Sequence, residues 1–79
     1  MKLPRDLSGE QLIRVLCRAW DYRRTGQVGS HVVLETDHPS HQRLVVPVHK
    51  ALRIGTLSAI LRSVAKHKAV SRHDLLKEL

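Results

Sequence analysis

Residues 26–34, Gly-Gln-Val-Gly-Ser-His-Val-Val-Leu, decide the fold that this sequence predicts. Gly26 and Gly29 allow backbone conformations that other residues resist, so they predict a sharp loop over residues 26–30. The β-branched run that follows predicts a strand. His31 is therefore expected where the loop meets the strand, next to rigid structure and in contact with solvent. Because histidine readily exchanges a proton near neutral pH, His31 is the first candidate for a functional residue.

The length and charge of the chain limit its class. Its 79 residues are enough for one domain, which we expect to span residues 1–79, and they leave room for only a modest core. The net charge of +7 and the isoelectric point of about 10.6 indicate a polyanionic partner: nucleic acid, an acidic protein or an anionic membrane. Trp20 and Tyr22 are the only aromatic residues, so phosphate contacts are expected to outweigh base stacking.

The cysteine content and the hydropathy pattern indicate the compartment. Cys17 is the only cysteine, which excludes an intramolecular disulfide and any zinc site with two cysteine ligands. Such a chain suits the reducing cytoplasm. The sequence shows no secretory apolar region and no apolar run near the roughly 20 residues of a membrane span. We therefore expect a cytoplasmic protein.

Helices are predicted toward both ends of the chain. Near the start, Ser8 and Gln11 form a capping-box pattern that precedes apolar residues at helical spacing. Later, the same spacing predicts a helix that has Thr56 as its N-cap and ends near His67, and Ser71 begins a last short helix. The apolar residues that support these predictions are Leu12, Ile13, Leu16 and Trp20 in the first helix and Leu57, Ile60, Leu61 and Val64 in the second.

Three strands are expected between the helices, over residues 21–25, 31–36 and 43–48. Pro47 cannot donate a backbone hydrogen bond, so it marks an edge strand or a strand end. The short connections favour an antiparallel meander, and two long helices can cover only one of its faces. The predicted fold class is α+β: a three-stranded antiparallel sheet with helices on one face, in the order α-β-β-β-α plus a short C-terminal helix.

The alternation of residues in the second strand predicts the direction of His31. Val32 and Leu34 are the natural core-facing pair, so His31 is expected on the opposite, open face of the sheet. The turn after this strand carries His38 and His41 without an evident third metal ligand. We therefore expect no metal site and no cofactor.

Four segments of the chain, taken in their order and spacing, resemble a known toxin family. They are Gly29-Ser30-His31, residues 44–49, residues 55–57 with 60–62, and residues 70–76. The chain is similar to the HicA/YcfA family of mRNA interferases from bacterial and archaeal toxin–antitoxin pairs. The resemblance implies a fold like that of the double-stranded-RNA-binding domain, ribosome-independent cleavage of mRNA with His31 as the active residue, and neutralisation by a HicB-type antitoxin. The sequence departs from the family pattern at Gly26, where many members have Arg, and at Ala69, where a helix-ending Gly is usual.

RNA contains its own nucleophile, the 2′-hydroxyl group, so it can be cleaved without a metal once a base removes the proton. We expect His31 to be that base, or the acid that protonates the leaving oxygen. Gly29 lets the backbone approach a phosphate, and Ser30 either binds that phosphate or braces the loop. His49 is the candidate for a second catalytic group. The cations expected to hold the RNA backbone are Arg23, Arg24, Lys50 and Arg53.

Three function classes remain open from the sequence. The first is a toxin that cleaves mRNA as a metal-independent endoribonuclease and is inhibited by an acidic, HicB-like antitoxin. The second is a non-catalytic module of the same fold, which would bind RNA and leave it intact. The third is a domain whose basic face docks an acidic protein. Incubation of the purified protein with RNA discriminates the first class from the other two.

Overall fold

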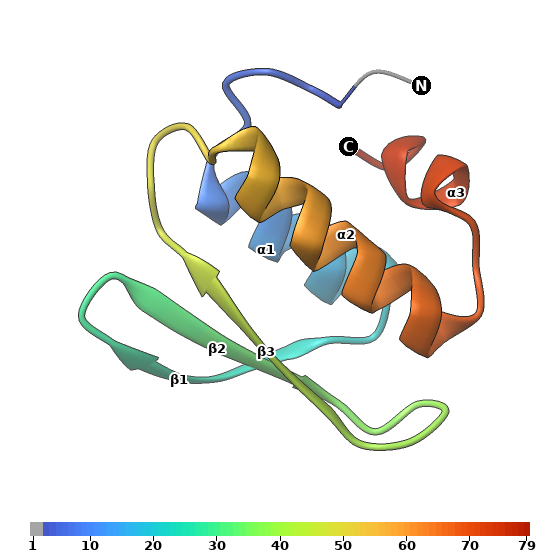
Figure 1. Ribbon diagram of the computed structural model, residues 1–79. Helices are drawn as coiled ribbons and strands as arrows, with labels where there is room; N and C mark the ends of the chain where they lie inside the picture. Colours follow the sequence, from blue (N-terminus) through green and yellow to red (C-terminus); the bar gives the residue numbers. More distant parts are fainter. Residues whose placement is uncertain (1–2) are drawn as a thin grey trace.

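The sheet is an antiparallel meander with both long helices on one side of it (Figure 1). The computed structural model describes residues 3–79. The elements in that range are α1 (Gly9–Ala19), β1 (Arg23–Val28), β2 (His31–Thr36), β3 (Gln42–Pro47), α2 (Ile54–Lys68) and α3 (Arg72–Leu76). The strands pair in the order β1-β2-β3, and both pairs are antiparallel. This arrangement confirms the predicted α+β fold class and the element order.

Side-chain caps begin α1 and α3 as the sequence predicts. The Ser8 hydroxyl accepts a hydrogen bond from the backbone N–H of Gln11, and the Gln11 side chain accepts one from the backbone N–H of Ser8. Ser71 and Asp74 form the same reciprocal pair at the start of α3. Both capping boxes satisfy N–H groups that have no partner within the helix.

The start of α2 differs from the prediction. The helix begins at Ile54, has Arg53 as its N-cap and lacks a side-chain cap, so the predicted cap at Thr56 is wrong. The preceding residue, Leu52, is 5% exposed, and its N–H donates to the carbonyl of Leu7 at 2.8 Å. Leu52 is therefore anchored by burial and by a backbone bond directly before the N-cap, and this anchor accounts for the earlier start of α2.

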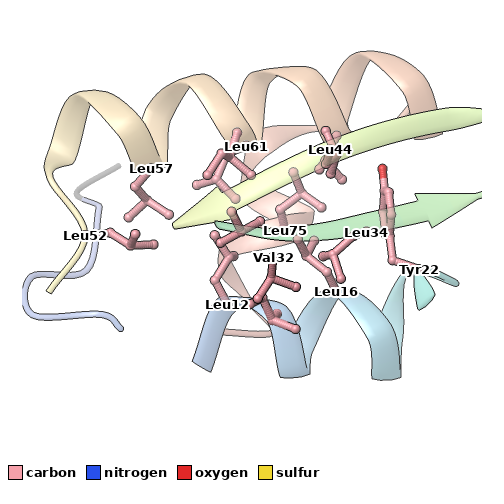
Figure 2. Close-up of a cluster of buried hydrophobic side chains, with 14 residues drawn as sticks. Leu12, Leu16, Tyr22, Val32, Leu34, Leu44, Leu52, Leu57, Leu61 and Leu75 are labelled. Atoms are coloured by element: carbon pink, nitrogen blue, oxygen red, sulfur yellow. The ribbon is translucent and has the colours of Figure 1, made fainter. Parts of the chain in front are cut away.

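Leucines from both long helices pack over one face of the sheet. Figure 2 shows Leu57 and Leu61 of α2 and Leu12 and Leu16 of α1 in one cluster with residues of β2. Each such side chain contributes about 1.5–3 kcal/mol when it is fully buried. The apolar side chains exposed by 1% or less are Leu12, Leu16, Val32, Leu34, Val46, Leu57, Leu61, Val64 and Leu75. The central strand β2 is therefore firmly held from the helix side.

The first strand lies later in the chain than predicted. β1 extends from Arg23 to Val28, so the predicted strand over residues 21–25 and the predicted loop over residues 26–30 are both wrong. The pairing with β2 shifts between Arg24 and Gly26, where Thr25 forms a bulge. Pairing continues beyond the bulge from Gly26 to Val28, so Gly26 belongs to the strand and only Gly29 and Ser30 remain in the loop.

Ala69 ends α2 in the left-handed conformation, with φ 56° and ψ 43°. A residue with a Cβ atom is strained in this conformation, which glycine adopts freely. The chain then turns into α3, where Leu75 is 1% exposed and belongs to the core. Among the helices of residues 3–79, none is both long and apolar enough to span a membrane.

Candidate functional site

His31 begins β2 directly after a loop of two residues. Gly29 and Ser30 alone connect β1 to β2, and Val28 pairs with His31 across this loop. Gly29 has a φ of +57°. A glycine with positive φ at the first position is typical of tight two-residue hairpins, because other residues are strained there. The backbone that leads into His31 therefore has little freedom.

The side chain of His31 is exposed on the open face of the sheet. This confirms the predicted direction, since Val32 is fully buried on the helix side. The cross-strand neighbours of His31 are Val28 in β1 and Pro47 in β3. Together with Val33 and Val45 in the next row, they form an apolar strip, defined here as Val28, Val33, Val45 and Pro47. His31 is thus the one titratable group in this row of the sheet.

The end of β3 holds the loop before His31 from one side. The N–H of Val48 donates to the carbonyl of Ser30 at 2.6 Å, and the N–H of Gly9 donates to the carbonyl of His49 at 2.9 Å. Gly9 has no room for a side chain, because a Cβ atom there would lie 2.0 Å from the carbonyl oxygen of Pro47. The start of α1, the end of β3 and the loop are therefore locked together, and Ser30 braces the loop through its backbone.

Arg23 and Arg24 point to opposite faces of β1. Arg23 lies on the open face and pairs with exposed Asp37 at 2.9 Å. Arg24 lies on the helix side, where its Nη2 atom is 3.3 Å from Oε1 of Glu10 and 3.1 Å from Oε1 of Gln27. The structure therefore does not bring the two arginines together as one cationic cluster.

Charged side chains occupy the other end of the open face. Arg23 lies opposite Glu35 in the register of β1 and β2. Glu35 is four residues from His31, a separation of about 13 Å along a strand. His41 lies 3.2 Å from Glu35 and 3.2 Å from Asp37. The hydrogen bond with His41, and to a lesser degree the nearby Arg23, holds the pKa of Asp37 below its ordinary value. The open face is thus apolar around His31 and ionic farther along.

Lys50 and Arg53 lie in the segment that joins β3 to α2, and both are exposed. Lys50 is three residues from Pro47, the cross-strand neighbour of His31. Arg53 lies at a hollow of about 330 Å³ whose other lining residues are Arg5, Asp6, Ala51, Leu52 and Ile54. The four predicted cations are Arg23, Arg24, Lys50 and Arg53. Lys50 is the one that lies nearest in sequence to Pro47, at the end of β3.

Cys17 has the environment of a core residue. It packs against the buried cluster, and burial raises the pKa of its thiol more than the nearby Arg24 lowers it. A thiol that stays protonated is a poor nucleophile. Within residues 3–79, no three His, Cys, Asp or Glu side chains gather closely enough to hold a metal ion.

Gln27 is a residue that the sequence analysis did not select. Its Nε2 atom donates to the carbonyl of Gly29 at 3.0 Å, so the side chain folds back onto the loop before His31. The sequence placed Gln27 inside a loop, whereas it belongs to β1, so its contact with Gly29 was not expected.

A comparison of the whole sequence with models of known protein families gives a match. The family model of the HicA toxin of bacterial toxin–antitoxin systems matches residues 9–65, from the start of α1 into α2. Neither the comparison with curated proteins nor that with solved structures gives a match. The matched span includes His31 and covers well over half of the 79 residues. The chain therefore belongs to the HicA toxin family of bacterial toxin–antitoxin systems.

Proposed function

We propose that this toxin is an endoribonuclease that cleaves mRNA with His31 as its catalytic residue. The observation that carries the proposal is the placement of His31. Its side chain is exposed, its strand is buried on the other face, and the carbonyls of Gly29 and Ser30 before it are both hydrogen bonded. A catalytic group gains from this position because substrate can reach it while its backbone stays fixed. Membership of the HicA toxin family supports the same activity.

In the proposed reaction the 2′-oxygen of one nucleotide attacks the adjacent phosphorus, in line with the 5′-oxygen that leaves. The bond from phosphorus to the 2′-oxygen forms and the bond to the 5′-oxygen breaks, which gives a 2′,3′-cyclic phosphate and a 5′-hydroxyl. His31 either removes the 2′-proton or donates a proton to the 5′-oxygen, a role that typically contributes about 10²–10⁴-fold. His49 is our candidate for the other proton transfer, because its carbonyl is anchored to Gly9 beside the strand end.

Three exposed cations are proposed to hold the RNA backbone. Lys50 is assigned to the reacting phosphate, with Gly29 and Ser30 allowing the close approach. Arg23 is assigned to a neighbouring phosphate, since it lies farther along the open face. Its ion pair with Asp37 is exposed and therefore weak, so a phosphate can replace Asp37. Arg53 is assigned to backbone beyond the loop. Arg24 faces the helix side, and we assign it no phosphate.

We also propose that the paired antitoxin is an acidic, HicB-like protein that covers His31. Val28 and Val45 of the apolar strip are 75% and 42% exposed, and grouped exposed apolar side chains are typical of protein interfaces. The net charge of +7 favours an acidic partner. The rate of association is expected to fall as salt rises, because salt screens the attraction. A complex in which His31 stays exposed would contradict this part of the proposal.

Cleavage of a synthetic RNA by the purified toxin tests the reaction. Cleavage should continue in EDTA and stop when the nucleotide at the cut site carries a 2′-deoxy or 2′-O-methyl sugar. The matched control carries the same modification two nucleotides away and should still be cut. Loss of cleavage in EDTA that magnesium restores would contradict the metal-independent reaction. RNA that is bound and remains intact would instead identify a non-catalytic RNA-binding module.

A further inference from the structure

Side-chain hydrogen bonds connect α1 to the loop before His31. The Nη2 atom of Arg24 lies 3.3 Å from Oε1 of Glu10 and 3.1 Å from Oε1 of Gln27. The Nε2 atom of Gln27 then donates to the carbonyl of Gly29 at 3.0 Å. These four residues, Glu10, Arg24, Gln27 and Gly29, are called the bracing chain below. It lies on the helix side of β1, away from the face that exposes His31.

Each member of the bracing chain orients the next one. The amide of Gln27 has an oxygen that only accepts and a nitrogen that only donates hydrogen bonds. Since Arg24 donates to the oxygen, the nitrogen must face the carbonyl of Gly29. The carboxylate of Glu10 in turn accepts from the Arg24 guanidinium at 3.3 Å, an exposed contact that limits the directions in which the guanidinium can point. The Gln27 amide cannot flip without losing both of its partners.

The bracing chain also completes the support of the loop. The two peptide carbonyls directly ahead of His31 are bound from different elements: Gly29 by the Gln27 side chain, and Ser30 by the N–H of Val48. Both supports lead to adjacent residues at the start of α1. Gly9 holds the end of β3 and Glu10 holds Arg24 of β1. Removal of the Gln27 bond would free one of the two carbonyls and leave the other fixed.

We propose that Gln27 is a positioning residue for His31, oriented by Arg24 and Glu10. The inference rests on the proposed function, because it gives Gln27 a part in the same reaction. A displacement of about 1 Å at a reacting group can lower a rate by as much as about 10²-fold. We expect loss of the Gln27 bond to lower kcat about tenfold and to change KM less than about twofold, because none of the cations assigned to the RNA backbone is changed.

Gln27→Glu is the sharpest test of this role. The variant keeps the size of the side chain and can still accept from Arg24, but a carboxylate cannot donate to the Gly29 carbonyl. It should therefore lose about as much kcat as Gln27→Ala. Arg24→Ala should lower kcat similarly, and the double variant with Gln27→Ala should fall no further, since both changes break one chain. Arg18→Ala is the matched control for charge, because it changes the net charge by the same amount as Gln27→Glu, at an exposed site on α1. This control should keep the wild-type kcat.

Backbone order parameters of Ser30 and His31 from NMR provide a second readout that needs no catalysis. They should fall in Gln27→Glu and Arg24→Ala and stay at the wild-type level in Arg18→Ala. If the wild-type protein fails to cleave RNA, the proposed function is wrong and the NMR measurement still decides whether Gln27 fixes the loop. Unchanged order parameters in Gln27→Glu would overturn the positioning role. An unchanged kcat in an active enzyme would overturn it as well.

Discussion

Replacement of Gly9 by alanine is expected to destabilise the protein, although alanine is the better helix former. Gly9 is buried at the first position of α1, against the end of β3. A Cβ atom there would lie 2.0 Å from the carbonyl oxygen of Pro47 and 3.0 Å from the Cα atom of Val48. Because Cβ atoms essentially never approach other atoms closer than 3.0 Å, α1 and the end of β3 must separate by about 1 Å.

The expected loss for Gly9→Ala is about 2 kcal/mol. Forcing an extra methyl group into a packed contact costs about 1–3 kcal/mol. The displacement also stretches the 2.9 Å hydrogen bond from Gly9 to the carbonyl of His49, which is worth about 1 kcal/mol. The higher helix propensity of alanine offsets up to about 1 kcal/mol. In a domain of this size, 1 kcal/mol shifts Tm by about 4–8 °C, so Tm should fall by about 8–16 °C.

Thermal unfolding followed by circular dichroism measures this loss. Gly55→Ala is the matched control, because Gly55 also lies in the first turn of a helix and a Cβ atom there would meet nothing within 4 Å. The control should be more stable than the wild type, by up to about 1 kcal/mol. A Gly9→Ala protein that melts at or above the wild-type temperature would refute the packing of α1 against β3.

Further substitutions test other parts of the structure. Ala69→Gly should stabilise the protein by about 1 kcal/mol, because glycine accepts the left-handed conformation with φ 56°. The control Ala59→Gly, in the middle of α2, should destabilise the protein by a similar amount. Equal shifts in Tm for the two variants would contradict this reasoning. The hydrogen bond from the backbone of Ser71 lowers the pKa of Asp74. The stability that the ionised Asp74 carboxylate adds is therefore present above the ordinary aspartate pKa, and it is lost as the pH falls through the lowered pKa of Asp74. Tm should therefore drop more between about pH 6 and about pH 3 in the wild type than in Asp74→Ala, and equal drops would argue against the cap. Leu75→Ala should cost about 2–5 kcal/mol in denaturant unfolding, and a loss under about 1 kcal/mol would show that α3 packs loosely.

The parts of the fold that depend on local residues were predictable. The capping box of Ser8 with Gln11 and the apolar spacing in α2 act within one helix, and both predictions are confirmed. The position of β1 was not predictable, because the bulge at Thr25 exists only through pairing with β2. The start of α2 likewise depends on Leu52, whose backbone partner is Leu7, 45 residues earlier in the chain. Contacts between different segments of the chain decided both differences.

The same distinction applies to the site. The alternation of residues in β2 predicted that His31 faces solvent, because burial of Val32 settles the face of its neighbour. The separation of Arg23 from Arg24 could not be predicted, since it follows from the strand register and from the carboxylates that each arginine meets. The resemblance to the HicA family, confirmed by the family comparison, supplied the toxin role that charge alone left open.

The rate of RNA cleavage by His31→Ala tests the central claim most directly. His31 is exposed, so the substitution should change the free energy of unfolding by less than about 0.5 kcal/mol. The rate should fall by about 10²–10⁴-fold, the usual contribution of a positioned histidine. His73→Ala, which removes an exposed histidine from α3, is the matched control and should cleave at the wild-type rate. A His31→Ala protein that folds normally and cleaves RNA as fast as the wild type would contradict the account.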